Sequence, residues 1–192
     1  QTLLPMLDEI VKMTEFDLNT LDAVAVAAGP GSFTGLRIGI ATVKAFCDSK
    51  KISYKGVSSL QSLAYNSKQV YGNNFSGLVC SIIDCKNSNC YFALYEFKKG
   101  ICHTLIDPTA DTIENALNVL KNYSNILFVG DGAIIYCDLI KQIYSNSTFF
   151  ENVSDNNLNS YSLALAGYDI FIKNGSDSNL LPLYLRKPQA QR

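Results

Sequence analysis

The sequence predicts an α/β protein, because short apolar runs typical of buried strands alternate with stretches of helical periodicity. Residues 23–28 are apolar throughout, as in a parallel strand that helices cover on both faces. A glycine-rich turn then leads into a helical stretch at about 34–48. A second strand, turn and helix follow at 126–144.

The first part of the chain predicts two unusual helices. Leu3, Leu7 and Ile10 recur at helical spacing, which predicts an amphipathic helix over 2–13. The helix at 34–48 is apolar around nearly its whole circumference, so we expect it to be buried on all sides. That burial requires either the junction of two lobes or another subunit. A strand at 52–57 and a helix from Ser58 to about residue 71 complete this part.

The polar segment 72–76 predicts a boundary between two lobes, residues 1–75 and 76–192. The second lobe should begin with antiparallel strands, because polar turns join its first β-runs. Its expected elements are strands at 77–84, 90–97, 101–106 and 126–129, helices at about 112–123, 133–144 and 161–173, a loop at 145–159, and an extended tail from Leu180.

Composition narrows the possible functions. The 192 residues are 47% hydrophobic and 17% charged, with a formal net charge of −1. Basic residues are scattered, which argues against autonomous binding of nucleic acid. Six cysteines without any C-x-x-C pair are typical of reduced thiols in a cytoplasmic protein. No apolar run approaches the length of a membrane span, and no secretory signal is seen, so we expect no membrane association.

The glycine-rich turn at 29–35 lies where backbone N–H groups gather at a helix N-terminus, the geometry of an anion site. It fits neither phosphate-binding pattern. Thr34 replaces the third glycine of G-x-G-x-x-G, and no lysine follows Gly35. A packing role is favoured over a nucleotide site: Gly29 and Gly31 permit a tight turn, while Gly35 and Gly39 let a neighbouring helix approach closely. The loop is Gly29, Pro30, Gly31, Ser32, Phe33, Thr34 and Gly35.

Candidate catalytic residues are few. Arg37 lies in the first turn of its helix, where its charge opposes the helix dipole, so we expect a specific partner such as a carboxylate of this or another chain. His103 is the single histidine, which disfavours a serine–histidine–aspartate triad and a histidine-based metal site. Asp84 and Asp131 follow strands in different predicted units and lack a third carboxylate, so they are weak metal-ligand candidates.

Several motifs together resemble the TsaB (YeaZ) family, whose members are bacterial partners of the tRNA-modification enzyme TsaD. The segment G-P-G-S-F-T-G-L-R-I-G at 29–39 is long and specific. Residues 3–7 resemble the family's L-L-P-x-I helix, 56–60 its G-(V/I)-S-x-L segment, 82–86 its I-D-A-R/K hairpin, and 182–190 its closing P-x-Y-L-R-x-x-x-A. The matches run in family order over nearly the whole chain.

The resemblance implies an actin-like (ribonuclease H-like) two-lobe fold, with the first lobe lacking its N-terminal strands in this chain. It also implies a non-catalytic subunit. TsaD carries H-x-x-x-H after its G-P-G loop, whereas the matching stretch here has serine at 58, 59 and 62. We therefore expect no metal and no cofactor, and we expect Ser58 to be a helix N-cap.

The function that the resemblance implies is that of a scaffold. The chain would pair with a TsaD-like catalytic subunit and, with a TsaE-like ATPase, support threonylcarbamoyl transfer to adenosine in tRNA. Contact with tRNA is expected only within the complex. The same helices could instead form a homodimer. The expected interface residues are Leu3, Leu7, Ile10, Leu36, Arg37, Ile38, Ala41 and Ala45.

Two alternatives remain at this point. One is a glycoprotease-like peptidase, which the missing second histidine disfavours. The other is a stand-alone actin-like ATPase or sugar kinase, which the imperfect phosphate loop disfavours.

Overall fold

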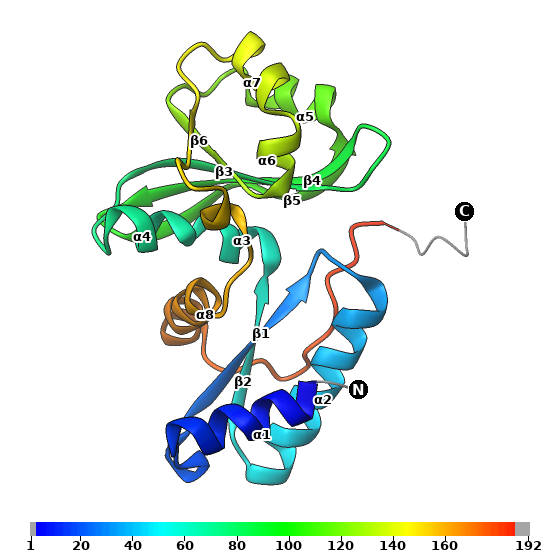
Figure 1. Ribbon diagram of the computed structural model, residues 1–192, viewed down its shortest axis with the longest axis vertical. Helices are drawn as coiled ribbons and strands as arrows, with labels where there is room; N and C mark the ends of the chain where they lie inside the picture. The colour runs from blue at the N-terminus through cyan, green and yellow to red at the C-terminus, as the bar shows by residue number, and fades with distance from the viewer. Residues whose placement is uncertain (1–2, 187–192) are drawn as a thin grey trace.

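The structure is a computed structural model that describes residues 3–186 (Figure 1). Residue 2 of the first predicted helix and residues 187–190 of the closing motif lie outside this range. The chain forms two sheets. Strands β1 (Ala23–Gly29) and β2 (Ser53–Ser58) pair in parallel, and five further strands form a mixed sheet in the order β5-β4-β3-β6-β7.

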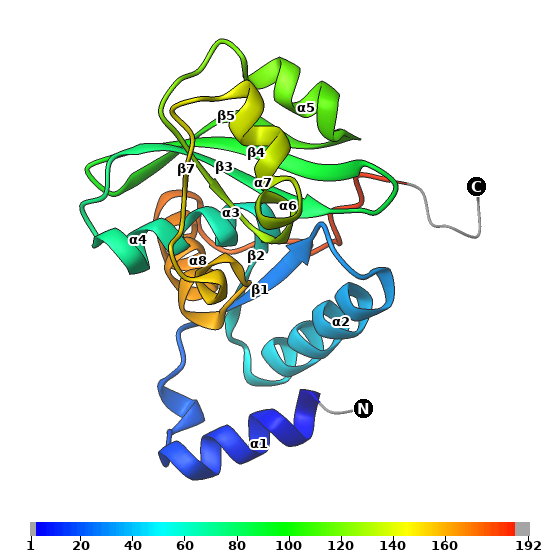
Figure 2. The ribbon, with the colours of Figure 1, turned by 45° about the horizontal axis from the view of Figure 1, so that its top comes forward.

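The first lobe is built on the two-stranded sheet. Helix α1 (Leu3–Thr14) and the short 3-10 helix η1 (Leu18–Thr20) precede β1, and α2 (Phe33–Lys50) connects β1 to β2. The predicted helix from Ser58 divides at Tyr65 into α3 (Ser59–Ala64) and α4 (Asn66–Tyr71). Figures 1 and 2 both show α1 at the outer edge of this lobe.

The second lobe is built on the five-stranded sheet. Its strands are β3 (Gly77–Asp84), β4 (Asn89–Lys98), β5 (Ile101–Thr112), β6 (Ile126–Val129) and β7 (Thr148–Phe149). The prediction for β6 is confirmed, whereas β5 runs six residues past the predicted end at residue 106. Pro108 lies within this extension, and β5 is an edge strand, where a missing N–H group is tolerated. The sheet's outer helices are α5 (Ile113–Leu120), α6 (Asp131–Ile135) and α7 (Cys137–Ile143).

The segment predicted as a loop at 145–159 contains β7 and the 3-10 helix η2 (Val153–Asn156). Helix α8 (Ser160–Asn174) then packs on α3, β1 and β2 (Figure 1). The extended tail follows α8 past the first lobe, where Asp177 N donates to Tyr54 O (3.1 Å). The proposed lobe boundary at 72–76 stays a prediction, and the last helix returns to the sheet of the first lobe.

Two hydrophobic clusters hold the fold together. One joins the lobes: it contains Leu60 and Leu63 of α3, Tyr95 of β4 and Ala166 of α8. The other lies on the opposite side of the five-stranded sheet and contains residues of α5, α6 and α7. The large sheet is therefore covered on both faces, as the α/β prediction requires. Within residues 3–186, no helix has the length and apolar character that a membrane crossing needs.

Candidate partner-binding site

Helix α1 exposes its apolar side chains. None of its residues is buried, and Leu7 and Ile10 are 43% and 54% exposed. Leu3 is half-buried. The sequence analysis missed three further apolar side chains on the same helix, because it followed a single stripe: Leu4, Met6 and Met13 are also exposed. Within residues 3–186, nothing covers this apolar surface.

Helix α2 covers β1 and β2 with one face only. Ile40 and Cys47 are its buried residues, so the expectation of burial on all sides is wrong for the described part of the chain. Ile38 is 49% exposed. The predicted interface residues Arg37, Ile38, Ala41 and Ala45 are all exposed, and Leu36 is half-buried. Together, the exposed apolar residues of α1 and α2 are called here the outer helical face.

The glycine loop fixes the chain's C-terminal tail. Gly29 ends β1 with a φ of +115°, a conformation that favours glycine. A Cβ atom there would lie 2.7 Å from Leu183 O. Leu183 N donates to Ala28 O (2.6 Å) beside it. Ser32 begins α2 as its N-cap and accepts a hydrogen bond from Gly35 N (3.3 Å). These contacts favour the packing role of the loop.

Arg37 has a partner, but it is not a carboxylate. Its Nε donates to Tyr184 Oη (2.9 Å), and its guanidinium lies 4.1 Å from the ring centroid of Phe33. Phe33 and Tyr184 stack with their centroids 4.4 Å apart. The prediction of a carboxylate partner within the described chain is therefore wrong. Two of the family-like motifs, 29–39 and 182–186, meet at this contact.

Gly39 faces open space. A Cβ atom built on Gly39 would meet nothing within 4 Å, and one on Gly35 would meet only Ser32. The predicted close approach of a neighbouring helix is thus wrong within residues 3–186. The surface of α2 near Gly39 is free to accept another molecule.

Asp84 and Asp131 lie together, because β3 and β6 are adjacent parallel strands. Asp131 Oδ1 accepts hydrogen bonds from Asp84 N (3.1 Å) and Gly132 N (2.8 Å). The Asp84 carboxylate accepts from Tyr136 Oη (2.8 Å) and pairs with Lys86 Nζ (2.8 Å). The two aspartates belong to different elements, as predicted, but those elements are adjacent and bring the residues into contact. Within residues 3–186, no three side chains of the His, Cys, Asp and Glu types are grouped to hold a metal ion.

Opposing effects set the pKa of Asp84. Burial alone would raise it, but hydrogen bonds from Lys86 and Tyr136 outweigh burial and hold the pKa below its usual value. Both interactions come from its own lobe. The carboxylate therefore acts as a fixed anion that stabilises the turn between β3 and β4.

Ser58 begins α3 but does not cap it through its side chain. The prediction that Ser58 is the N-cap of this helix is confirmed by its position, but its Oγ is buried and has no hydrogen-bond partner among the described residues. His103 is exposed and lies on β5. It is far along the chain from the serines at 58, 59 and 62.

Comparison with known proteins identifies the family. The model of the family "TsaD: tRNA N6-adenosine threonylcarbamoyltransferase" matches residues 1–169. The TsaB protein of Bacillus subtilis, a tRNA threonylcarbamoyladenosine biosynthesis protein, is 28% identical over 98% of this chain and 80% of its own length. The chain belongs to the TsaB/YeaZ family. A TsaB relative from Haemophilus influenzae is 27% identical over 96% of this chain and 78% of its own length.

Solved structures agree with the membership in the TsaB/YeaZ family. A Pseudomonas aeruginosa protein described as similar to the peptidase YEAZ superposes with a TM-score of 0.79 and 23% identity, over 97% of this chain and 83% of its own. YeaZ from the same organism gives a TM-score of 0.72 and 21% identity, over 96% and 84%. These likenesses confirm the prediction of an actin-like (ribonuclease H-like) α/β fold.

Proposed function

We propose that this TsaB-family chain is a non-catalytic scaffold subunit in the synthesis of N6-threonylcarbamoyladenosine in tRNA. It binds a TsaD-like catalytic subunit through the outer helical face. The observation that carries the proposal is the exposure of Leu7, Ile10 and Ile38, which are 43%, 54% and 49% exposed on two successive helices. Relatives that match nearly the full chain are named for this pathway.

The open surface of α2 supports pairing by helices. Ile38, Ala41 and Ala45 are exposed, and Gly39 leaves open space in which a partner helix could approach the backbone. Burial of large apolar side chains would supply the binding free energy, at roughly 25 cal/mol for each Å² removed from water. The same face is available to a second copy of this chain, so a homodimer and the complex with the catalytic subunit would compete.

The assignment as non-catalytic rests on residue types. Serine stands at 58, 59 and 62, where the resemblance places the paired histidines of the catalytic relative. Two imidazoles one helical turn apart would bind a metal ion, and serine hydroxyls are poor substitutes for them. A TsaE-like ATPase and tRNA complete the proposed assembly, which would work in the cytoplasm.

The proposal is tested with the full-length protein and its cognate TsaD-like subunit. We expect the two to elute together from a sizing column, and we expect the protein to restore threonylcarbamoyladenosine to tRNA in an extract depleted of it. The variant Leu7→Glu/Ile10→Glu should do neither. Restoration by a protein that does not bind the catalytic subunit would contradict the scaffold role.

A second measurement tests whether the outer helical face is free before pairing. Hydrogen exchange in α1 of the isolated full-length protein should be fast and should slow when the catalytic subunit is added. Protection of α1 in the isolated monomer would show that the protein's own chain covers this face, and the proposed interface would then be wrong.

A further inference from the structure

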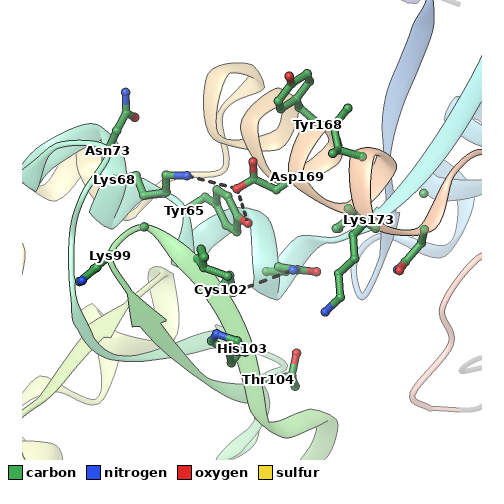
Figure 3. Close-up of a pocket in the computed structure, with 17 residues that line it drawn as sticks. Tyr65, Lys68, Asn73, Lys99, Cys102, His103, Thr104, Tyr168, Asp169 and Lys173 are labelled. Carbon is green, nitrogen blue, oxygen red and sulfur yellow. Dashed lines mark hydrogen bonds and ion pairs between the residues drawn. The ribbon is translucent and has the colours of Figure 1, made fainter.

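A large pocket lies at the Gly77 end of β3, opposite the end that carries Asp84. Its walls come from α3, α4, the beginning of β5 with the turn before it, and α8 (Figure 3). Its volume is about 920 Å³, near the upper end of the usual range for small-molecule sites. No residue of the outer helical face lines it.

One wall is held in place by a partly buried polar cluster. Tyr65 Oη and Lys68 Nζ both contact Asp169 Oδ2, at 2.9 and 3.2 Å. The side chain of Lys68 is only 9% exposed. Burial, with the nearby Cys102 and Asp169, raises the pKa of Tyr65, so its hydroxyl stays protonated and donates. The negative charge of Asp169 is therefore already compensated by this wall.

The remaining charges in the pocket are positive. Lys99 extends from the β4–β5 turn and Lys173 from the last turn of α8. Neither forms an ion pair with a carboxylate within the described part of the chain. Figure 3 shows them on opposite sides of the pocket, with Tyr65 and Cys102 between them. Among the described residues that line the pocket, Asp169 is the single acidic one, so positive charge is in excess.

We propose that this pocket binds phosphate groups, with Lys99 and Lys173 as the charged donors. Two ammonium groups on separate elements suit a ligand that carries several anionic oxygens. Thr104 lines the same pocket and offers a neutral hydroxyl donor. The phosphate could belong to a free nucleotide or to the backbone of an RNA. The site shares no residue with the outer helical face, so it is independent of the proposed scaffold role.

The test uses the full-length protein and three probes: inorganic pyrophosphate, ATP and a tRNA. The pocket variant is Lys99→Gln/Lys173→Gln. The control variant, Lys50→Gln/Lys121→Gln, removes the same charge from exposed positions outside the pocket. Calorimetry measures binding of pyrophosphate and ATP, and fluorescence anisotropy measures binding of tRNA. We expect at least one probe to bind the unmodified protein, with affinity reduced about tenfold or more in the pocket variant. The control should change affinity less than about twofold.

The outcomes distinguish the source of the phosphate. Binding of pyrophosphate or ATP would assign the site to a free phosphate compound, and binding of tRNA alone would assign it to an RNA backbone. Adenosine, which lacks phosphate, should not bind. The variant Lys99→Arg/Lys173→Arg keeps both charges and should retain binding. If the pocket variant has a lowered melting temperature, the single variants Lys99→Gln and Lys173→Gln are compared with the unmodified protein instead. The proposal would be overturned if none of the three probes bound. It would also be overturned if the pocket variant and the control variant lost affinity equally.

Discussion

Helices α1 and α5 are both amphipathic, yet they meet opposite environments. Helix α5 buries Ile113, Ala116, Leu117 and Leu120 against the five-stranded sheet. Helix α1 buries none of its residues. The apolar pattern of a helix thus predicts which face is suited to burial. It does not show whether that face packs against the same chain. The difference between the two helices is the basis of the proposed scaffold role.

The largest expected difference between these helices is in folding stability. Leu117→Ala removes a fully buried side chain and should lower the free energy of unfolding by about 3 kcal/mol. Leu7→Ala removes a side chain that is 43% exposed and should lower the free energy of unfolding by less than about 0.5 kcal/mol. Urea unfolding of the two variants measures both values. Equal losses would mean that α1 is packed as firmly as α5, which would break the comparison.

Two glycines of one motif sharpen the same contrast. Gly29→Ala places a Cβ atom 2.7 Å from Leu183 O at a φ of +115°, and should destabilise the fold by about 2 kcal/mol. Gly39→Ala meets nothing within 4 Å in the interior of a helix, and should stabilise the fold by about 0.5 to 1 kcal/mol.

Thermal unfolding measures the change in stability of the two glycine variants, and a pull-down with the catalytic subunit measures pairing. Gly39→Ala should pair more weakly despite its greater stability. Pairing as strong as that of the unmodified protein would mean that no partner approaches the backbone at Gly39.

A smaller difference concerns two aspartates. The pKa of Asp84 is lowered in the folded state, so its ionised form stabilises the fold above the unfolded pKa of about 3.9, and this contribution disappears as pH falls through the folded pKa. Because Lys86 is exposed and solvent screens the pair, Asp84→Asn should cost less than about 1 kcal/mol at pH 7. Asp8→Asn breaks an exposed pair with Lys12 and should have no measurable effect.

The pH dependence of unfolding checks the prediction for Asp84. The stability difference between the unmodified protein and Asp84→Asn should shrink as the pH is lowered below about 4. A difference that stays constant down to acidic pH would show that ionisation of Asp84 is not its origin.

Much of the fold follows from local sequence signals. Periodicity and turn residues predict β3, β6 and α8 to within about two residues, because each element shows its own pattern. The full length of β5 was missed, because pairing with the beginning of β4 extends it through Pro108. That pairing is a long-range contact, and the propensities of residues 107–112 do not reveal it.

The candidate site was predicted in part. Ile38, Ala41 and Ala45 were predicted as interface residues of α2, and the structure leaves all three exposed. The partner of Arg37 was missed because Tyr184 lies 147 residues further along the chain. The pocket that contains Lys99 and Lys173 was missed for the same reason. Its lysines at 68, 99 and 173 belong to separate elements and form no sequence motif.

The central claim is most directly tested by the affinity of the full-length protein for its TsaD-like subunit after one charge is added to either lobe. Ile38→Glu alters the outer helical face, and Ile135→Glu alters a residue of α6 that is similarly exposed, at 54% against 49%. We predict that Ile38→Glu weakens binding at least about tenfold, because a carboxylate would be buried in an apolar interface, and that Ile135→Glu changes binding less than about twofold. Equal affinity for the two variants would contradict the account.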